Sequence, residues 1–344
     1  MPRHPFRSVQ GSLESIEINS GALAGNLLGD PPRRSTSVYL PPGYDSTESD
    51  FPLIVYLGAY TSSAPKKVGW RAFEENIPQR LERLVREERM GPVVMAFPDS
   101  FTSLGGNQFV NSPVTGNWED YLLAELIPAL EQQFRISSNP GLRGLIGFSS
   151  GGYGALQHGL LHAESWGGIA AHSPDLGFEL AFRSDLASLV TQISRNRDSI
   201  PEFLGRLWEA PKLEGSHFHS LMLLGLAASY DPAPDEPLGI RLPVDLETCE
   251  LIPERWQNWL RFDPLHQLEE AVCQRNLRRL RGLFLDCGTY DQYHLQYGLR
   301  RFVRRLRDLE IPHVHEEFPD SHSSAEYRLD ESLPYLYRSL IDPY

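Results

Sequence analysis

Cysteine is scarce in this chain of 344 residues. Its three cysteines, Cys249, Cys273 and Cys287, are odd in number and include no Cys-x-x-Cys pair. Disulfide frameworks and thiolate zinc sites are built from such pairs, so the sequence indicates neither. A reducing compartment fits this cysteine usage, and we expect a cytoplasmic protein.

Positive charge and long apolar runs are scarce too. The 32 lysines and arginines stand against 45 aspartates and glutamates, which gives a net charge of −13 at pH 7. Because such a chain repels polyphosphate, we expect no nucleic acid and no anionic membrane surface as a partner. The longest apolar stretch, residues 221–228, is far too short to span a bilayer, and the N-terminus lacks the apolar run of a signal peptide.

Short apolar segments bounded by Pro, Gly or Asp are what the chain does contain. Each has the character of a buried strand, and helical patterns lie between them. This alternation predicts an α/β fold with a mostly parallel central sheet and helices on both faces. A hairpin at 12–19 and 35–40 is expected to feed the sheet. The other predicted strands are 53–57, 93–97, 142–146, 168–171, 282–287 and a last one near 312–318.

The clearest helical pattern spans residues 118–134. Asn117 is expected to cap its start, and Pro128 is expected to bend its middle. The apolar positions that repeat every four residues are Leu122, Leu126, Leu130 and Phe134.

The alternation stops within residues 173–263, which contain helical patterns and no convincing strand. We therefore expect a core made of residues 1–172 and 264–344 and a mainly helical insertion at 173–263. The insertion either covers one end of the sheet and adds an apolar pocket, or is a structural or dimer-forming appendage.

The segment "LIGFSSGGYGAL", residues 145–156, places a serine at the turn between a predicted strand and a predicted helix. In Gly147-Phe148-Ser149-Ser150-Gly151, the flanking glycines would let Ser149 project its hydroxyl over the sheet. The helix N-terminus favours a developing oxyanion, with the backbone N–H of Ser150 as one donor. We therefore expect Ser149 to be a nucleophile.

A serine nucleophile needs a histidine base and a carboxylate that orients it, in the chain order Ser, acid, His for this architecture. His322 follows the last predicted strand and is the expected base. His313 and His315 fall within that strand, and His294 comes only three residues after the expected acid. Asp291, at the carboxyl end of the 282–287 strand, is that acid.

Two other carboxylates compete with Asp291 for the role of the acid. Asp286 is the alternative, although it lies inside the strand. Asp320 is only two residues before His322, which is too close in sequence for its carboxylate to orient the imidazole from the side opposite Ser149.

With these residues placed, the chain resembles the esterase family of α/β-hydrolases that includes esterase D (S-formylglutathione hydrolase), enterochelin esterases, feruloyl esterases and mycolyltransferase antigens. The resemblance spans the chain except the insertion and implies an α/β-hydrolase fold. Residue by residue, it implies Ser149 as nucleophile, Asp291 as acid and His322 as base, and no cofactor. It rests on "VYLPPGYD" (38–45), "VVMAFPDS" (93–100), "GNWEDYLLAELIPALEQQF" (116–134), "GFSSGGYGAL" (147–156), "DCGTYD" (286–291) and "FPDSHSS" (318–324).

The resemblance also implies a second oxyanion donor in the loop after the 53–57 strand. Relatives often have His-Gly there, whereas this chain has Leu57-Gly58-Ala59-Tyr60, so the backbone N–H of Ala59 or Tyr60 would serve. Trp118 and Tyr153, and the Tyr60 side chain, are candidates for the substrate pocket.

A metal site is not expected. His158 and His162 have helical i, i+4 spacing but no acidic partner between them.

These residues predict a serine hydrolase that cleaves a small-molecule carboxylic ester or thioester through an acyl-enzyme. The same triad could instead transfer the acyl group to an alcohol or a sugar. A third hypothesis is a binding protein that keeps the fold without the chemistry, favoured only by the missing His-Gly.

Overall fold

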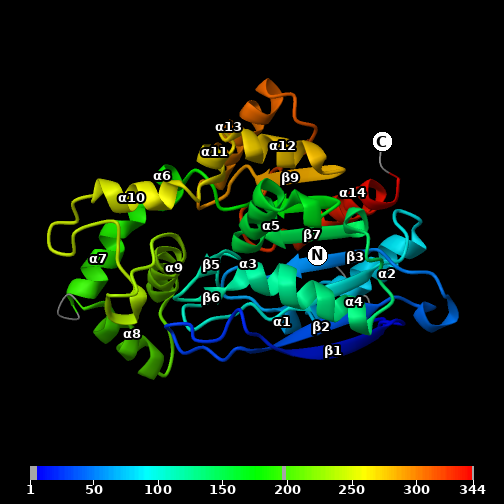
Figure 1. Cartoon of the computed structure of the whole chain (residues 1–344), viewed down its shortest axis with the longest axis horizontal. Coiled ribbons are helices and arrows are strands. Elements are labelled where there is room, and N and C mark those ends of the chain that lie inside the picture. Colours follow the sequence, from blue (N-terminus) through cyan, green and yellow to red (C-terminus); the bar gives the residue numbers. More distant parts are fainter. Residues whose placement is uncertain (1–5, 196–198, 343–344) are drawn as a thin grey trace.

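The computed structural model describes residues 6–195 and 199–342 and is built around an eight-stranded sheet (Figure 1). The strand order is β1-β2-β4-β3-β7-β8-β9-β10. β1 pairs antiparallel with β2 and β2 antiparallel with β4, whereas β4, β3, β7, β8, β9 and β10 run parallel to one another. The predicted hairpin and strands are confirmed to within two residues. Their bounds are β1 Ser12–Asn19, β2 Arg33–Leu40, β3 Leu53–Leu57, β4 Val94–Pro98, β7 Arg143–Phe148, β8 Gly168–His172, β9 Gly282–Gly288 and β10 Val314–Phe318.

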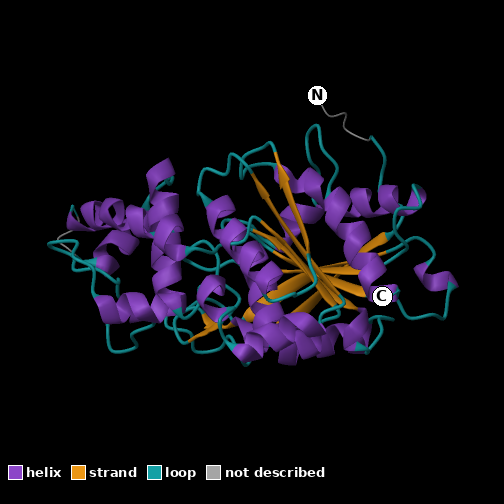
Figure 2. Cartoon of the chain, turned by 90° about the horizontal axis from the view of Figure 1, so that it is seen from above, coloured by secondary structure: helices purple, strands orange, loops and turns teal. Residues whose placement is uncertain are grey.

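Helices cover both faces of this sheet (Figure 2). Every residue of β3 is buried, because its alternate side chains enter two different cores. Ile54 and Tyr56 belong to the core that contains side chains of α2 and α14, whereas Val55 belongs to the core that contains side chains of α4, α5, α12 and α13. The predicted α/β class, with helices on both faces, is therefore confirmed. These helices are α2 Ile77–Arg86, α4 Ile127–Gln133, α5 Ser150–Leu161, α12 Ala271–Arg279, α13 Leu295–Asp308 and α14 Leu329–Ile341.

The helix expected at 118–134 is present but is not one regular α-helix. It consists of α3 Trp118–Asp120, a π-helical stretch Tyr121–Leu126, and α4. Pro128 has no N–H to donate, and its ring crowds the preceding turn. Just before it, the helical hydrogen bonds span five residues instead of four, as in the bond from the Ile127 N–H to the Leu122 carbonyl. Asn117 is at the N-cap position, but its side chain makes no capping hydrogen bond, so that expectation was wrong.

Between β8 and β9 the described residues form helices and add no strand to the main sheet. The helices α7 to α10 lie beyond one end of the sheet in both views (Figures 1 and 2). Besides α12, the α-helices in this segment are α6 Phe178–Ala181, α7 Leu186–Ser194, α8 Ile200–Glu209, α9 Gly215–Tyr230, α10 Pro253–Leu260 and α11 Pro264–Gln267. None of the helices in the described part of the chain combines the length and apolar content needed to cross a bilayer.

The parallel strands all end at the same edge of the sheet, so the loops that follow them meet there. A close backbone approach fixes two of these loops. A Cβ atom on Gly288, at the end of β9, would overlap the backbone of Asp320, which follows β10. The Thr289 N–H donates to the Phe318 carbonyl at 2.8 Å, and the Tyr290 N–H donates to the Asp320 carbonyl at 3.0 Å. These contacts bring the chain around Asp291 next to the chain around His322.

Candidate active site

Ser149 lies at the turn between β7 and α5, in a backbone conformation that residues other than glycine rarely adopt. Its φ is 54° and its ψ is −122°. Such a conformation costs on the order of 1–3 kcal/mol and persists only where the surroundings impose it. The Ser149 N–H donates to the carbonyl of His172 at 2.9 Å, which ties the turn to the end of the neighbouring strand β8.

The glycines on either side of Ser149 are imposed by packing. A Cβ atom on Gly147 would overlap the backbone of Gly151, and a Cβ atom on Gly151 would overlap the carbonyl of Leu57. The two positions therefore need glycine because the turn is sharp and lies directly against β3.

His322 and Asp291 form a close pair at the same edge of the sheet. The distance between His322 Nδ1 and Asp291 Oδ2 is 2.7 Å, and the Asp291 side chain is fully buried. The Tyr293 N–H donates to Asp291 Oδ1 at 2.9 Å. The Cys287 thiol lies 3.5 Å from Asp291 Oδ2; burial, and then the Asp291 charge, raise the pKa of that thiol well above its usual range. Cys287 is therefore a neutral donor that helps to hold the carboxylate.

Asp286, the alternative acid, belongs to a different network inside the protein. Its Oδ1 lies 2.7 Å from His172 Nδ1, and His172 Nε2 lies 2.8 Å from the Ser332 hydroxyl. Arg328 Nε donates to Asp286 Oδ2 at 3.0 Å. The ring of Phe148 stacks on His172 with centroids 4.4 Å apart. Asp286 and His172 thus support the turn from below and do not face the cavity.

A cavity of about 320 Å³ at this edge is lined by both Ser149 and His322. Ala59 and Tyr60, the predicted oxyanion residues after β3, also line it. Their loop is held by two hydrogen bonds, from the Tyr60 hydroxyl to the Leu104 carbonyl at 2.9 Å and from the Thr61 N–H to the Gly105 carbonyl at 2.7 Å. Ser150, the other predicted donor, is the first residue of α5.

Two predicted pocket residues do not reach this cavity. Trp118 is fully buried, and its indole N–H donates to the Thr115 carbonyl at 2.9 Å. Tyr153 is also fully buried, and its hydroxyl donates to the Phe262 carbonyl at 2.9 Å. Both side chains belong to the buried core, and neither lines this cavity.

Asp175, just after β8, was missed by the sequence reasoning although it lines the cavity. The Ser149 hydroxyl lies 3.5 Å from Asp175 Oδ1, and the Ser150 hydroxyl donates to Oδ2 at 3.2 Å. Burial raises the pKa of Asp175 to about 6, although His322 and the Ser150 hydroxyl oppose the shift. The signal in the sequence was its place directly after a parallel strand, where site residues gather.

The helices between β8 and β9 form one wall of the cavity through Phe182, Phe218 and Met222. A ring contact extends this wall to the loop that carries Asp291. The centroids of His219, on α9, and Tyr293 are 5.9 Å apart, and Tyr293 meets the ring of His322 edge-on at 4.8 Å.

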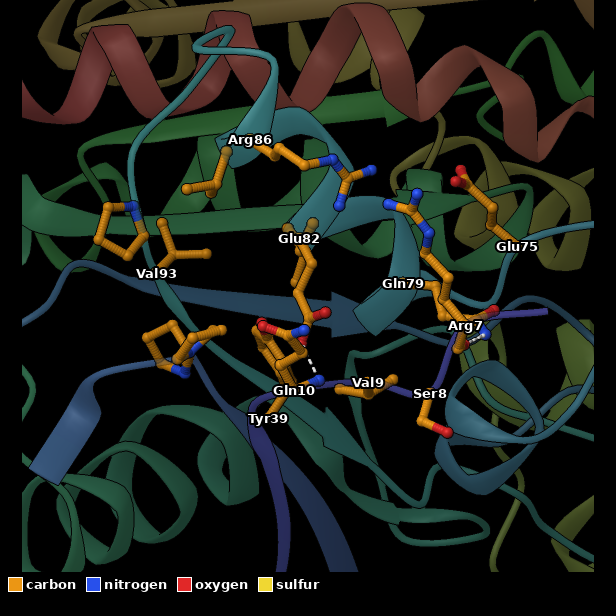
Figure 3. Close-up of a pocket in the computed structure, with 15 residues that line it drawn as sticks. Arg7, Ser8, Val9, Gln10, Tyr39, Glu75, Gln79, Glu82, Arg86 and Val93 are labelled. Carbon is orange, nitrogen blue, oxygen red and sulfur yellow. Dashed lines mark hydrogen bonds between the residues drawn. The ribbon is translucent and has the colours of Figure 1, made fainter. Parts of the chain in front are cut away.

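A second cavity, of about 750 Å³, is larger but lies away from these residues (Figure 3). The N-terminal segment, β2 and α2 contribute to its walls, and none of the described residues that line it is a histidine. Glu82 projects into it and accepts the N–H groups of Gln10 at 2.7 Å and Gly11 at 2.8 Å. Ser149 and His322 both line the smaller cavity and not this one.

The residues described include no group of three or more His, Cys, Asp or Glu side chains arranged to hold a metal ion. His158, one of the paired helical histidines, is buried against Trp166, and this burial lowers its pKa to about 4.

Comparison with known proteins places this site in a family. Residues 31–292 match the sequence model of the family described as "Putative esterase". A protein named Esterase Rv1288 from Mycobacterium tuberculosis is 30% identical over 87 residues, which are 24% of this chain and 18% of that protein. The match thus spans less than a fifth of the curated relative.

Solved structures share the fold over almost the whole chain. A ferulic acid esterase has a TM-score of 0.62 and 17% identity, covering 96% of this chain and 100% of that one. An S-formylglutathione hydrolase from Agrobacterium tumefaciens has a TM-score of 0.58 and 16% identity, covering 97% of each chain. These likenesses establish the predicted α/β-hydrolase fold.

The contact between Gly147 and Gly151 leads to a first prediction. Gly147→Ala should lower the free energy of unfolding by about 2–4 kcal/mol, because backbone must move to admit the methyl group. Gly215→Ala is the matched control, since a Cβ there would meet nothing within 4 Å. Urea unfolding followed by circular dichroism measures both. Equal stability of Gly147→Ala and the parent would contradict the close packing.

The raised pKa of Asp175 leads to a second prediction. In the unfolded chain this carboxyl ionises near its ordinary pKa of 3.8, and in the folded protein near 6, so raising the pH between these values destabilises the fold. Asp175→Asn should therefore raise the free energy of unfolding at pH 8 by up to about 3 kcal/mol, and this gain should disappear toward pH 4.

Asp263→Asn is the control for this prediction. Asp263 accepts backbone N–H groups from Gly177 at 3.0 Å and Phe178 at 2.8 Å on its two oxygens, and an amide nitrogen cannot replace either. Burial raises the pKa of Asp263 as well, but because the substitution removes backbone hydrogen bonds, it should destabilise the protein at both pH values. A pH-independent effect of Asp175→Asn in urea unfolding would show that the burial of its charge is not what matters.

Proposed function

The chain belongs to the esterase family, and from this premise we propose that it is a serine hydrolase that cleaves a carboxylic ester or thioester through an acyl-enzyme intermediate. One observation carries the proposal. Ser149, with its strained backbone, and His322 come from distant parts of the chain and line one cavity. His322 Nδ1 lies 2.7 Å from Asp291 Oδ2. A serine or histidine with only a structural role does not require this arrangement, whereas an activated serine does.

In the proposed reaction, Ser149 Oγ attacks the acyl carbon while His322 Nε2 takes its proton. Asp291 accepts the Nδ1–H of His322, which leaves Nε2 free as the base and stabilises the imidazolium that forms. The negative charge that develops on the carbonyl oxygen is stabilised by the backbone N–H of Ser150 and by that of Ala59 or Tyr60. His322 then protonates the leaving alcohol or thiol.

Deacylation repeats these steps with water as the nucleophile. Water gives its proton to His322, the new tetrahedral intermediate breaks down, and Ser149 regains its proton as the acid leaves. Asp175 has a separate role before the reaction begins. Its carboxylate accepts the Ser149 hydroxyl in the resting enzyme, so substrate must draw that hydroxyl toward His322.

Acyl transfer to an alcohol is the second candidate, and the apolar wall of Phe182, Phe218 and Met222 favours it. A wall of this kind excludes water and can hold an organic acceptor. The ratio of ester to acid products, measured with added alcohols, shows whether these alcohols compete with water for the acyl group.

A third prediction tests the nucleophile. Ser149→Ala should lower kcat for a 4-nitrophenyl ester by about 10⁴-fold or more, and Asp291→Asn by about 10³–10⁴-fold, because each removes part of one proton-transfer unit. Fluorophosphonate should label the parent at Ser149 and leave Ser149→Ala unlabelled.

Ser216→Ala, at an exposed serine on α9, is the control and should keep both activity and labelling. Circular dichroism of Ser149→Ala checks that the variant remains folded. Hydrolysis by Ser149→Ala at the parental rate would contradict the proposal. A folded parent that fluorophosphonate does not label would favour a binding protein without the chemistry.

A further inference from the structure

The cavity at Ser149 has two sides of different chemistry. Phe182, Phe218 and Met222, all between β8 and β9, make one side apolar. The other side comes from the segment after β3 and carries three cationic side chains, Lys66, Lys67 and Arg71. A substrate that fills the cavity must satisfy both sides.

The two sides belong to opposite layers of the protein. The ammonium of Lys67 lies 5.7 Å from the ring centroid of Tyr56, which packs with α2 and α14. Phe182 instead joins the core on the other face of the sheet. Ser149 follows β7, a central strand, so its hydroxyl lies between the cationic layer and the apolar layer.

The concentration of lysine at this site is unusual for the chain. The sequence contains three lysines, Lys66, Lys67 and Lys212, and two of them line the cavity. The charged residues that line it are three cations and two carboxylates, Asp175 and Glu326, in a protein whose net charge is −13. The cavity is thus locally positive on an acidic molecule, as in a site that attracts an anion.

Most of this charge is already paired, and Lys66 is the exception. Glu326 forms ion pairs with both Lys67 and Arg71, and Arg71 also pairs with Glu74 at 3.1 Å. Lys66 is exposed, and within the described residues its ammonium makes no ion pair or hydrogen bond with another side chain. It therefore remains available to a ligand.

Asp175 limits where an anionic group could bind. Its carboxylate lies 3.5 Å from the Ser149 hydroxyl, so a second negative charge next to the nucleophile would be repelled. An anionic substituent must therefore lie away from the reacting carbonyl, toward Lys66.

We propose, on the basis of the ester hydrolysis proposed above, that the substrate is an ester with an apolar group on one side of the scissile bond and a carboxylate on the other. Lys66 is the specificity-determining residue that binds this carboxylate. Lys67 and Arg71, held by Glu326, add to the local positive potential without contacting the substrate.

Two matched pairs of esters test this inference. In the first pair the charge is on the acyl side, with 4-nitrophenyl hemiglutarate against 4-nitrophenyl pentanoate. In the second it is on the alcohol side, with 4-(butanoyloxy)benzoate against its methyl ester. We expect kcat/KM to favour the charged member of one pair by roughly three- to tenfold at low salt, as for a partly exposed ion pair, and salt to reduce this preference.

Lys66→Glu should abolish or invert that preference while leaving kcat/KM for the neutral esters within about twofold, because Lys66 does not act on the reacting atoms. Lys212→Glu makes the same change in net charge at an exposed position outside the cavity and should keep the preference. No preference in either pair, or an equal preference in Lys66→Glu, would overturn the assignment.

Binding to Ser149→Ala separates this inference from the proposed reaction. Titration calorimetry on that variant, with the same four esters, measures the charge preference without turnover. If the parent cleaves none of the esters but Ser149→Ala binds the charged member more tightly through Lys66, the proposed hydrolysis fails and the charge preference stands. If the parent cleaves the neutral and charged esters equally well, the hydrolysis stands and the assignment of Lys66 fails.

Discussion

The backbone conformation of Ser149 is the constraint on which the rest of the site depends. A residue at φ 54° and ψ −122° would relax to an ordinary conformation if its neighbours allowed it. They do not, because Gly147 and Gly151 are in backbone contact across the turn and Gly151 lies against the end of β3. The hydrogen bond from the Ser149 N–H to the His172 carbonyl closes the same turn from the side of β8. Contacts from three adjacent strands, β3, β7 and β8, thus hold Ser149 in its strained conformation.

Two of the His–Asp pairs among the described residues, His172–Asp286 and His322–Asp291, have the same 2.7 Å separation but different surroundings. His172 and Asp286 face each other across the register of β8 and β9 and have no exposed surface, with Ser332 and Arg328 as their remaining partners. A histidine enclosed in this way cannot reach a substrate, and its effect is to hold Phe148 and the turn above it. His322 lies on a loop and lines the cavity, so of these two pairs it is the His322 pair that a ligand can reach.

Sequence reasoning succeeded where the structure follows from local pattern and chain order. The buried strands were found because parallel strands covered on both faces are continuous apolar runs. The contact between Asp291 and His322 could be expected because each follows one of the last two strands, and their roles as acid and base stay a prediction. The failures have a common physical cause, since they depend on where a side chain points. Trp118 and Tyr153 are buried in the core, and the wall formed by Phe182, Phe218 and Met222 depends on how the helices beyond the end of the sheet pack against it.

Asp175 is a buried carboxylate that no sequence motif marks, and its burial costs free energy of folding. A buried carboxylate is unfavourable, and its pKa near 6 records that cost, which a purely structural position would avoid with an amide or an apolar side chain. Its two oxygens are directed at the Ser149 and Ser150 hydroxyls, so its position is coupled to the turn after β7. The strain at Ser149 and the buried charge at Asp175 therefore fall within one hydrogen-bond distance of each other. Since neither helps the fold, and both are maintained by the rigid edge of the sheet, their coincidence supports the proposal that Ser149 is the nucleophile.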